Sequence, residues 1–438
     1  MRKIPTGMRT ILMIGCCGAL AIFSSTISKS PILPLFAKTL GATGAQIGWI
    51  ASASTLPGIL VSYLAGDLAD RFGYKKILIG SLLIFASAPF FYLLVQDPLG
   101  LGITRFYHGF ATAAFGPVAM AAIAAFSGRN TGQNLSLYSS VTMVGRALAP
   151  TVGGPAYDIG GPVSVFLIAG VAGVLALAAA VWFFRKPGET ENKEAVQMKK
   201  SEASPLPCKC VESITESIQD RAHLQWLDGD SPRSIYTLSF FKKLWGLLKY
   251  RPLLLVGILD ASAYFSYGAF EMIFPLYARQ RGLTTGQIGL LLGIQLAGII
   301  LFKPLFGRAS DRFGRLPMMV AGLLTCTLSF FLLAVLKPAY AIVPLILLYG
   351  LGFALITAST SALAADVARK GQLGASLGIL STLMDVGQTF GPPVIGAISD
   401  ACSYTAGIGV LGILLLLAAF GCIIALIRQG KAGAASPP

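Results

Sequence analysis

Long stretches almost free of charge dominate this chain of 438 residues, and they restrict its fold more than any other feature. Of its residues 55% are hydrophobic and 12% are charged, a composition unlike that of a soluble domain. A run of about 20 apolar residues can cross a bilayer, and a backbone inside lipid must satisfy its own hydrogen bonds. We therefore predict an all-α membrane protein. Its twelve predicted spans are approximately residues 10–37, 47–66, 77–95, 99–126, 133–157, 163–184, 251–278, 286–306, 316–336, 341–366, 373–399 and 405–427.

Basic residues are concentrated in one set of loops. If both termini lie on one side, that side carries 26 Lys and Arg residues and the opposite loops carry four. Without the long central segment the ratio is still 14 to 4. Cytoplasmic loops are enriched in Lys and Arg, so both termini are predicted to be cytoplasmic, in the plasma (inner) membrane. The net charge of +15 thus reflects membrane topology, and we expect no nucleic-acid partner.

The chain contains an internal repeat. The polar segment Gly66–Lys76 recurs 241 residues later, with Asp-Arg-Phe-Gly at the centre of both copies. Pro34–Lys38 matches Pro275–Arg279 at the same offset, and Gly145–Pro150 matches Gly387–Pro392 at an offset of 242. Such a repeat, with an even number of spans in each copy, predicts two related halves of parallel orientation. We expect a first bundle at 1–184, a cytoplasmic linker at 185–250 and a second bundle at 251–438.

The Gly-x-x-x-Asp-Arg-x-Gly pattern between the second and third spans of each half resembles the signature loop of the major facilitator superfamily. This resemblance implies two six-helix bundles, a cavity between them and alternating access. It also implies that the loop Asp engages the other half near span eleven and latches the cytoplasmic side shut. The matching residues are Gly66, Asp70, Arg71, Gly73, Asp311 and Arg312. A simpler alternative is that the basic residues only hold the loop in the cytoplasm.

A Gly- and Pro-rich motif lies in the fifth predicted span. Gly145-x-x-x-Ala149-Pro150-x-x-Gly153-Gly154 resembles a motif of drug-type antiporters, with Ala149 in place of the central Gly. Gly and Pro kink a helix and let a neighbouring helix pack closely. A merely structural kinked helix is the alternative. The candidate kink residues, including the repeat in span eleven, are Gly145, Arg146, Pro150, Gly154, Gly387 and Pro392.

Arg105 and His108 lie three residues apart in the fourth predicted span and so share one helical face. Arg105-x-x-x-Gly109 resembles a family element whose Arg is linked with proton transfer. His108 titrates near neutral pH and could relay protons. The simpler alternative for His108 is a hydrogen bond inside the bundle.

Further ionisable residues lie inside predicted spans, where a charge is costly and usually faces the protein interior. Asp260 and Glu271 are eleven residues apart in span seven, which returns to nearly the same helical face. The repeat places Ser30 opposite Glu271, and the resemblance implies that spans one and seven both line the cavity. Lys29 and Glu271 should therefore lie at similar depth on facing bundles, where we expect a mutual interaction or a water bridge. Asp385 in span eleven completes the candidate proton-coupling or cavity residues, and structural ion pairs are the alternative for all of them.

The linker at 185–250 carries mixed charge and reads as a tether, with a regulatory segment as the alternative. It contains Cys208 and Cys210, which lack the further ligands that a metal site needs. The sequence has no phosphate-binding loop and no enzyme motif, so we expect neither an enzyme nor a cofactor or metal.

These patterns favour a monomeric, proton-coupled transporter that exports a small amphiphilic organic compound and contacts only its substrate, protons and membrane lipids. One alternative is a proton-coupled uptake symporter for an organic anion or a lipid-like substrate. A non-transporting membrane receptor with the same fold is the alternative of another class.

Overall fold

The computed structural model describes residues 6–59, 69, 72–127, 131–184, 251–367 and 373–434. Residues 1–181 and 251–438 belong to one compact unit. The first copy of the signature loop, with Gly66, Asp70 and Arg71, lies outside the described residues. The predicted linker at 185–250, with Cys208 and Cys210, lies outside them as well.

The described residues fold into helices joined by short turns. Those of the first half are α1 (Thr6–Ile27), α2 (Ile32–Thr39), α3 (Gly44–Ser52), α5 (Tyr74–Tyr92), α6 (Pro98–Ser127) and α7 (Thr131–Phe184). Those of the second half are α11 (Arg251–Gln280), α12 (Thr285–Phe313), α13 (Arg315–Val335), the short 3-10 helix Ala339–Ala341, α14 (Ile342–Val367), α15 (Leu373–Ala401) and α16 (Tyr404–Ala434). Within these described ranges, nine helical stretches are long and apolar enough to cross a membrane.

Two predicted spans are interrupted. The first span breaks at residues 28–31 into α1 and α2, so that Lys29 lies in a turn and not in a continuous helix. Pro31 lies in the same turn, and proline cannot donate the backbone hydrogen bond that a helix interior requires. In the second span, α3 ends at Ser52 and a turn follows, in which Thr55 Oγ1 donates to the carbonyl of Ser52 at 2.7 Å. Each break lies in a polar stretch that ends in a proline, residues 24–31 and 52–57, which the predicted spans passed over.

α7 contains the fifth and sixth predicted spans. The backbone leaves helical conformation at Gly160 and Gly161, where φ reaches 65° at Gly161, a value that glycine adopts readily. The predicted boundary between these spans is thereby confirmed. The backbone stays helical at Pro150, so the expected kink in this motif is not a break in helical conformation.

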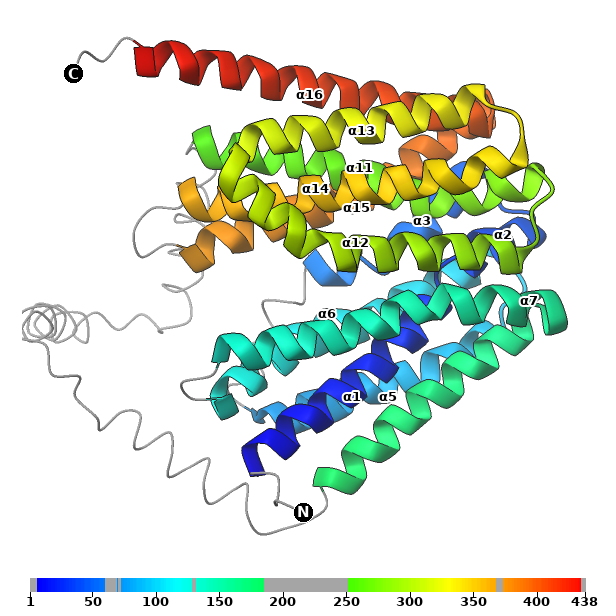
Figure 1. The fold of residues 1–438 in the computed structure, drawn as a ribbon. Helices are drawn as coiled ribbons and strands as arrows, with labels where there is room; N and C mark the ends of the chain where they lie inside the picture. Colours follow the sequence, from blue (N-terminus) through cyan, green and yellow to red (C-terminus); the bar gives the residue numbers. More distant parts are fainter. Residues whose placement is uncertain are drawn as a thin grey trace, which may run out of the picture. The chain divides into compact units, whose positions relative to one another are not determined.

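The helices of each half pack mainly with one another (Figure 1). In the second half α11 packs on α15, α13 lies between α14 and α16, and α12 packs on α14. In the first half α6 packs on α5 and α1. α1 begins and α16 ends on the same side of the bundle. We call the opposite side, where α3 and α12 begin, the distal side.

Two seams of small residues join the halves toward the distal side. In the first seam α3 packs on α15, and a Cβ on Gly48 would collide with the backbone of Pro392 and Pro393. In the second seam a Cβ on Gly289 of α12 would collide with the Pro150 carbonyl of α7 and approach Gly154. Gly48 and Gly289 are separated by the repeat offset of 241. The Gly-Pro motifs of spans five and eleven thus give the close helix approach expected of them.

We predict that Gly289→Val destabilises this arrangement. The added side chain has no space against the α7 backbone, and overpacking costs about 1–3 kcal/mol. The melting temperature of the purified protein in detergent should fall. Gly298→Val in the same helix is the matched control, because a Cβ there meets nothing within 4 Å. Equal melting temperatures for the two variants would contradict the close packing.

Candidate functional site

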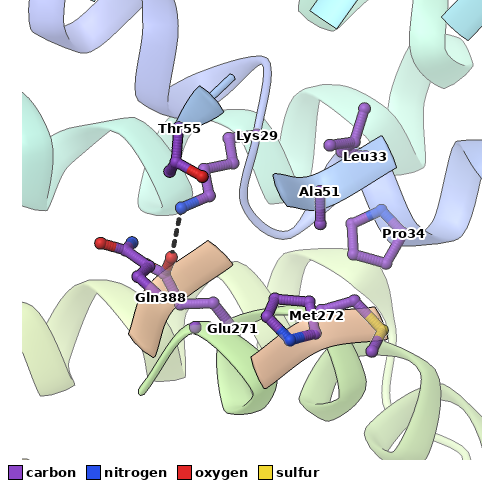
Figure 2. Close-up of a pocket in the computed structure, with 10 residues that line it drawn as sticks. Lys29, Leu33, Pro34, Ala51, Thr55, Glu271, Met272 and Gln388 are labelled. Atoms are coloured by element: carbon purple, nitrogen blue, oxygen red, sulfur yellow. Dashed lines mark hydrogen bonds and ion pairs between the residues drawn. The ribbon is translucent and has the colours of Figure 1, made fainter. Parts of the chain in front are cut away.

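A narrow pocket lies where the two halves meet, and Lys29 and Glu271 face each other across it (Figure 2). It has room for about one water molecule in this conformation. Each half contributes five of the lining residues. The first half supplies Lys29, Leu33, Pro34, Ala51 and Thr55, and the second supplies Gly268, Glu271, Met272, Gln388 and Pro392.

The central contact of the pocket is an ion pair between the halves. Lys29 Nζ lies 2.7 Å from Glu271 Oε2, and the two side chains are 23% and 14% exposed. The predicted interaction between these residues is confirmed. The break between α1 and α2 places Lys29 in a turn, from which its side chain reaches α11 (Figure 2).

Tyr267 binds the other oxygen of the same carboxylate. Its hydroxyl donates to Glu271 Oε1 at 2.8 Å, and its ring stacks on Phe353 at a centroid distance of 4.6 Å. Tyr264 meets Tyr267 edge to face at 6.2 Å. The sequence analysis missed Tyr267, although its position four residues before Glu271 places both on one face of α11. The Glu271 carboxylate is therefore bound at both oxygens, by the Lys29 ammonium of the first half and by the Tyr267 hydroxyl of the second half.

Asp260 occupies a separate polar position inside the second half. It is 3% exposed and accepts a hydrogen bond from Thr360 Oγ1 of α14 at 2.7 Å. Lys303 of α12 lies within electrostatic range. Eleven helical residues separate Asp260 from Glu271, about 16 Å along the axis. The two carboxylates thus have different partners.

Asp385 and Arg146, which the sequence places beside the Gly-Pro motifs, are less enclosed. Asp385 is half-buried and interacts electrostatically with Tyr264. Arg146 is exposed and makes no ion pair with another described residue, but it lies within electrostatic range of Glu271. The surroundings of Glu271 therefore include two cations, Lys29 in contact and Arg146 further away.

Arg105 and His108 are buried in the first half, at 2% and 1% exposure, and do not line the pocket. His108 Nδ1 pairs with the Tyr92 hydroxyl at 3.3 Å, and the His108 ring packs edge to face against Phe85 at 5.6 Å. This contact is the one expected of a histidine held inside the bundle. A proton-relay role for Arg105 and His108 stays a prediction.

The second copy of the signature loop makes its contacts within the second half. Arg315 forms ion pairs with Asp311 and with Asp366 of α14, the latter at 2.9 Å. Arg312 lies over the ring of Phe313, 5.6 Å from its centroid. In this conformation Asp311 thus pairs with a residue of its own half, on the side opposite to the distal side. Of the first copy, Gly73 is described and begins α5 with a φ of 83°.

The chain matches the model of the Major Facilitator Superfamily over residues 14–286 and 256–437. The chain belongs to the Major Facilitator Superfamily. It is 22% identical to an uncharacterized MFS-type transporter of Methanocaldococcus jannaschii, over 91% of this chain and 92% of the relative. It is 22% identical to the riboflavin transporter RibZ of Clostridioides difficile, over 82% and 81%. It is 21% identical to Multidrug resistance protein 2 of Bacillus subtilis, over 91% of each chain.

The fold of this MFS protein is similar to that of a bacterial homolog of the human lysosomal transporter Spinster. The TM-score is 0.75 over 97% of each chain, at 14% sequence identity. Family and fold together make the protein a multi-pass membrane transporter of small molecules, and not an enzyme. The predicted fold class and family are thereby confirmed.

We predict a favourable coupling energy between Lys29 and Glu271. Lys29→Met or Glu271→Gln alone leaves one partly buried group without its partner, whereas the double variant leaves neither. A double-mutant cycle on thermal unfolding should give a coupling of about 1–3 kcal/mol. The matched cycle combines Lys38→Met, in the exposed last turn of α2, with Glu271→Gln and should give no coupling. Additive effects of Lys29→Met and Glu271→Gln would contradict the ion pair.

Proposed function

We propose that this transporter exports small amphiphilic organic compounds in exchange for protons, and that the Lys29–Glu271 pair couples the two movements. The observation that carries the proposal is that this ion pair joins the two halves inside the pocket. Alternating access requires the halves to move relative to each other. Any such movement at this depth has to separate the two charges or neutralise one of them.

Proton binding to Glu271 removes one charge of the pair, so Lys29 and Glu271 can separate without leaving a bare carboxylate inside the membrane. A charged group of the substrate can replace the partner of either residue in the same way. Tyr267 remains on α11 beside Glu271 and can keep its hydrogen bond to the carboxyl group throughout. One site can thereby respond to both proton and substrate, which is the condition for coupling.

Export is favoured by the span-five motif and by the relative named Multidrug resistance protein 2. A specific observation favours the second candidate, proton-coupled uptake of an organic anion or a lipid-like compound. Arg146 lies within electrostatic range of Glu271 without an ion pair to a described residue, so a second cation besides Lys29 is available to an anionic substrate. The relative named as a riboflavin transporter is compatible with either direction.

We further propose that the protein lies in the plasma membrane with both termini cytoplasmic, so that the distal side faces outward. The asymmetry of Lys and Arg between the loops supports this orientation. The similar Spinster homolog was solved in an inward-facing, unoccupied conformation. That likeness supports assigning the joined distal seams to a closed outer face.

We predict that Glu271→Gln abolishes transport driven by a pH gradient while substrate binding persists, because glutamine cannot exchange a proton. The measurement is flux of a panel of fluorescent amphiphiles, including ethidium and riboflavin, in proteoliposomes with an imposed pH gradient. Binding is followed separately by thermal shift. Asp97→Asn, in a turn outside the pocket, is the control and should transport normally. Gradient-driven flux that survives in Glu271→Gln would refute the coupling role.

We predict that Lys29→Ala moves the pH profile of flux toward higher pH, because a carboxylate that has lost a neighbouring cation binds a proton more readily. Lys38→Ala, a lysine on α2 that does not line the pocket, should leave the profile in place. The profile is measured in proteoliposomes at a series of symmetric pH values. If Lys29→Ala changes neither flux nor its profile, Asp260 or Asp385 becomes the better candidate for coupling.

A further inference from the structure

Two carboxylates on the distal side each bind the first turn of a helix from the other half. Asp400, in the last turn of α15, accepts the backbone N–H groups of Gly44 at 2.6 Å and Ala45 at 2.9 Å, at the start of α3. Asp158 of α7, two residues before the break at Gly160, does the same for α12. It accepts the N–H groups of Thr285 at 3.1 Å and Gly286 at 2.7 Å.

The internal repeat relates these two contacts. The donor residues of α3 and α12 are 241 positions apart, and the acceptors Asp158 and Asp400 are 242 positions apart. These are the offsets that align the rest of the two halves. The arrangement therefore occurs twice, with the halves exchanging the roles of donor and acceptor, as the pseudo-twofold relation requires.

Each helix start is completed only by the opposite half. In α3 the capping box of Thr43 and Gln46 satisfies the N–H groups of these two residues from within the first half. The N–H groups of the first two helical positions, Gly44 and Ala45, remain, and a helix has no internal partner for them. Asp400 accepts both of them. α12 has the same capping box in Thr284 and Gln287, and Asp158 accepts its first two N–H groups.

The physical strength of this contact suits a reversible gate. A carboxylate at a helix N-terminus gains from the helix dipole and from charge-assisted hydrogen bonds. Small residues allow the approach, since a Cβ on Gly44 would collide with the Asp400 carboxylate and one on Gly286 would lie 3.0 Å from Asp158. When the halves separate, water can hydrate both the carboxylate and the freed N–H groups. The contact therefore raises the free energy of separating the halves on the distal side, but it does not block their separation.

We propose that Asp158 and Asp400 are paired gating residues of the transport cycle, which hold the distal side closed and set how readily it opens. This inference rests on the proposed function in treating the distal side as the outer face of an alternating-access transporter. The two residues do not line the pocket. They bias the equilibrium between the two conformations by contacts that only the distally closed one can make.

The test measures how fast a buried distal position becomes accessible. Ser52 of α3 is 1% exposed and its hydroxyl donates to the Thr389 carbonyl of α15 at 2.5 Å, so Ser52→Cys reports separation of that seam. It is introduced in a background in which the native cysteines are replaced by serine, because Cys402 is an exposed thiol on the same side and Cys16 is exposed as well. A membrane-impermeant maleimide is applied to right-side-out and to inside-out vesicles.

Asp158→Asn and Asp400→Asn should each accelerate labelling of the Ser52→Cys thiol from the distal side severalfold, and the double variant by about tenfold or more. Asp97→Asn is the matched control. Asp97 also accepts a backbone N–H at a helix start, that of Gly100 at 2.7 Å, but within its own half, so the contact moves with that half. Unchanged labelling in the double variant, or an equal increase in Asp97→Asn, would overturn the proposal.

A second variant removes a donor and leaves both carboxylates intact. Ala45→Pro deletes one of the two N–H groups that Asp400 accepts, at a first-turn position where a helix makes no use of that N–H. It should accelerate labelling as Asp400→Asn does, and combining the two should add little. Full additivity would show that Asp400 acts through something other than the start of α3, which also overturns the proposal.

The labelling rates are measured with neither substrate nor a pH gradient, so the gating proposal can fail or succeed independently of the proposed function. Labelling of a variant that keeps Cys402 as its one cysteine shows which vesicle face is distal. Distal acceleration in the Asn variants together with a lack of gradient-driven flux would keep the gating role and reject proton-coupled transport. Normal flux with unaltered labelling would do the reverse.

Discussion

The ion pair between Lys29 and Glu271 is the contact that makes the two halves depend on each other, because it is the point where a partly buried charge of one half meets a partly buried charge of the other. An ionised group at membrane depth is costly without a partner. Each half supplies the opposite charge that the other half's ionised group requires, so charge pairing holds the halves together in addition to close packing. The contact is also reversible, since a proton can neutralise Glu271 and a charged ligand group can take the place of either partner.

The seams of small residues work by a different principle. At Gly48 and Gly289 the backbones of two helices approach so closely that a methyl group would not fit. Such contacts have no charge to neutralise and respond to neither proton nor substrate. They set the distance at which the halves meet, while the ion pair is, in the function we propose, the contact that a proton or a charged substrate breaks. A transporter needs both, since a switch acts only between surfaces that meet in a defined way.

How far the sequence predicted this arrangement depended on the kind of pattern involved. The repeat offset of 241 predicted that Lys29 and Glu271 lie at similar depth, because parallel halves place equivalent residues at the same level, and the family resemblance placed both of their spans at the cavity. The break in the first span was not predicted, although the polar residues Ser28, Lys29 and Ser30 interrupt the apolar run just before Pro31. Tyr267 was missed because aromatic residues are common in such spans, although its spacing from Glu271 was informative.

Asp158 and Asp400 show most clearly what a one-dimensional pattern leaves out. Both were visible at equivalent positions, and so were the capping boxes of Thr43 and Thr284. Neither feature shows which residue accepts the free N–H groups of the helix start, because water or the preceding loop can accept them equally well. The partner follows only when the parallel repeat brings the end of span eleven to the start of span two, and the end of span five to the start of span eight. A twofold related pair then means that both seams have to open for either half to move away. The closed distal state is therefore held by two equivalent contacts whose loss is cooperative.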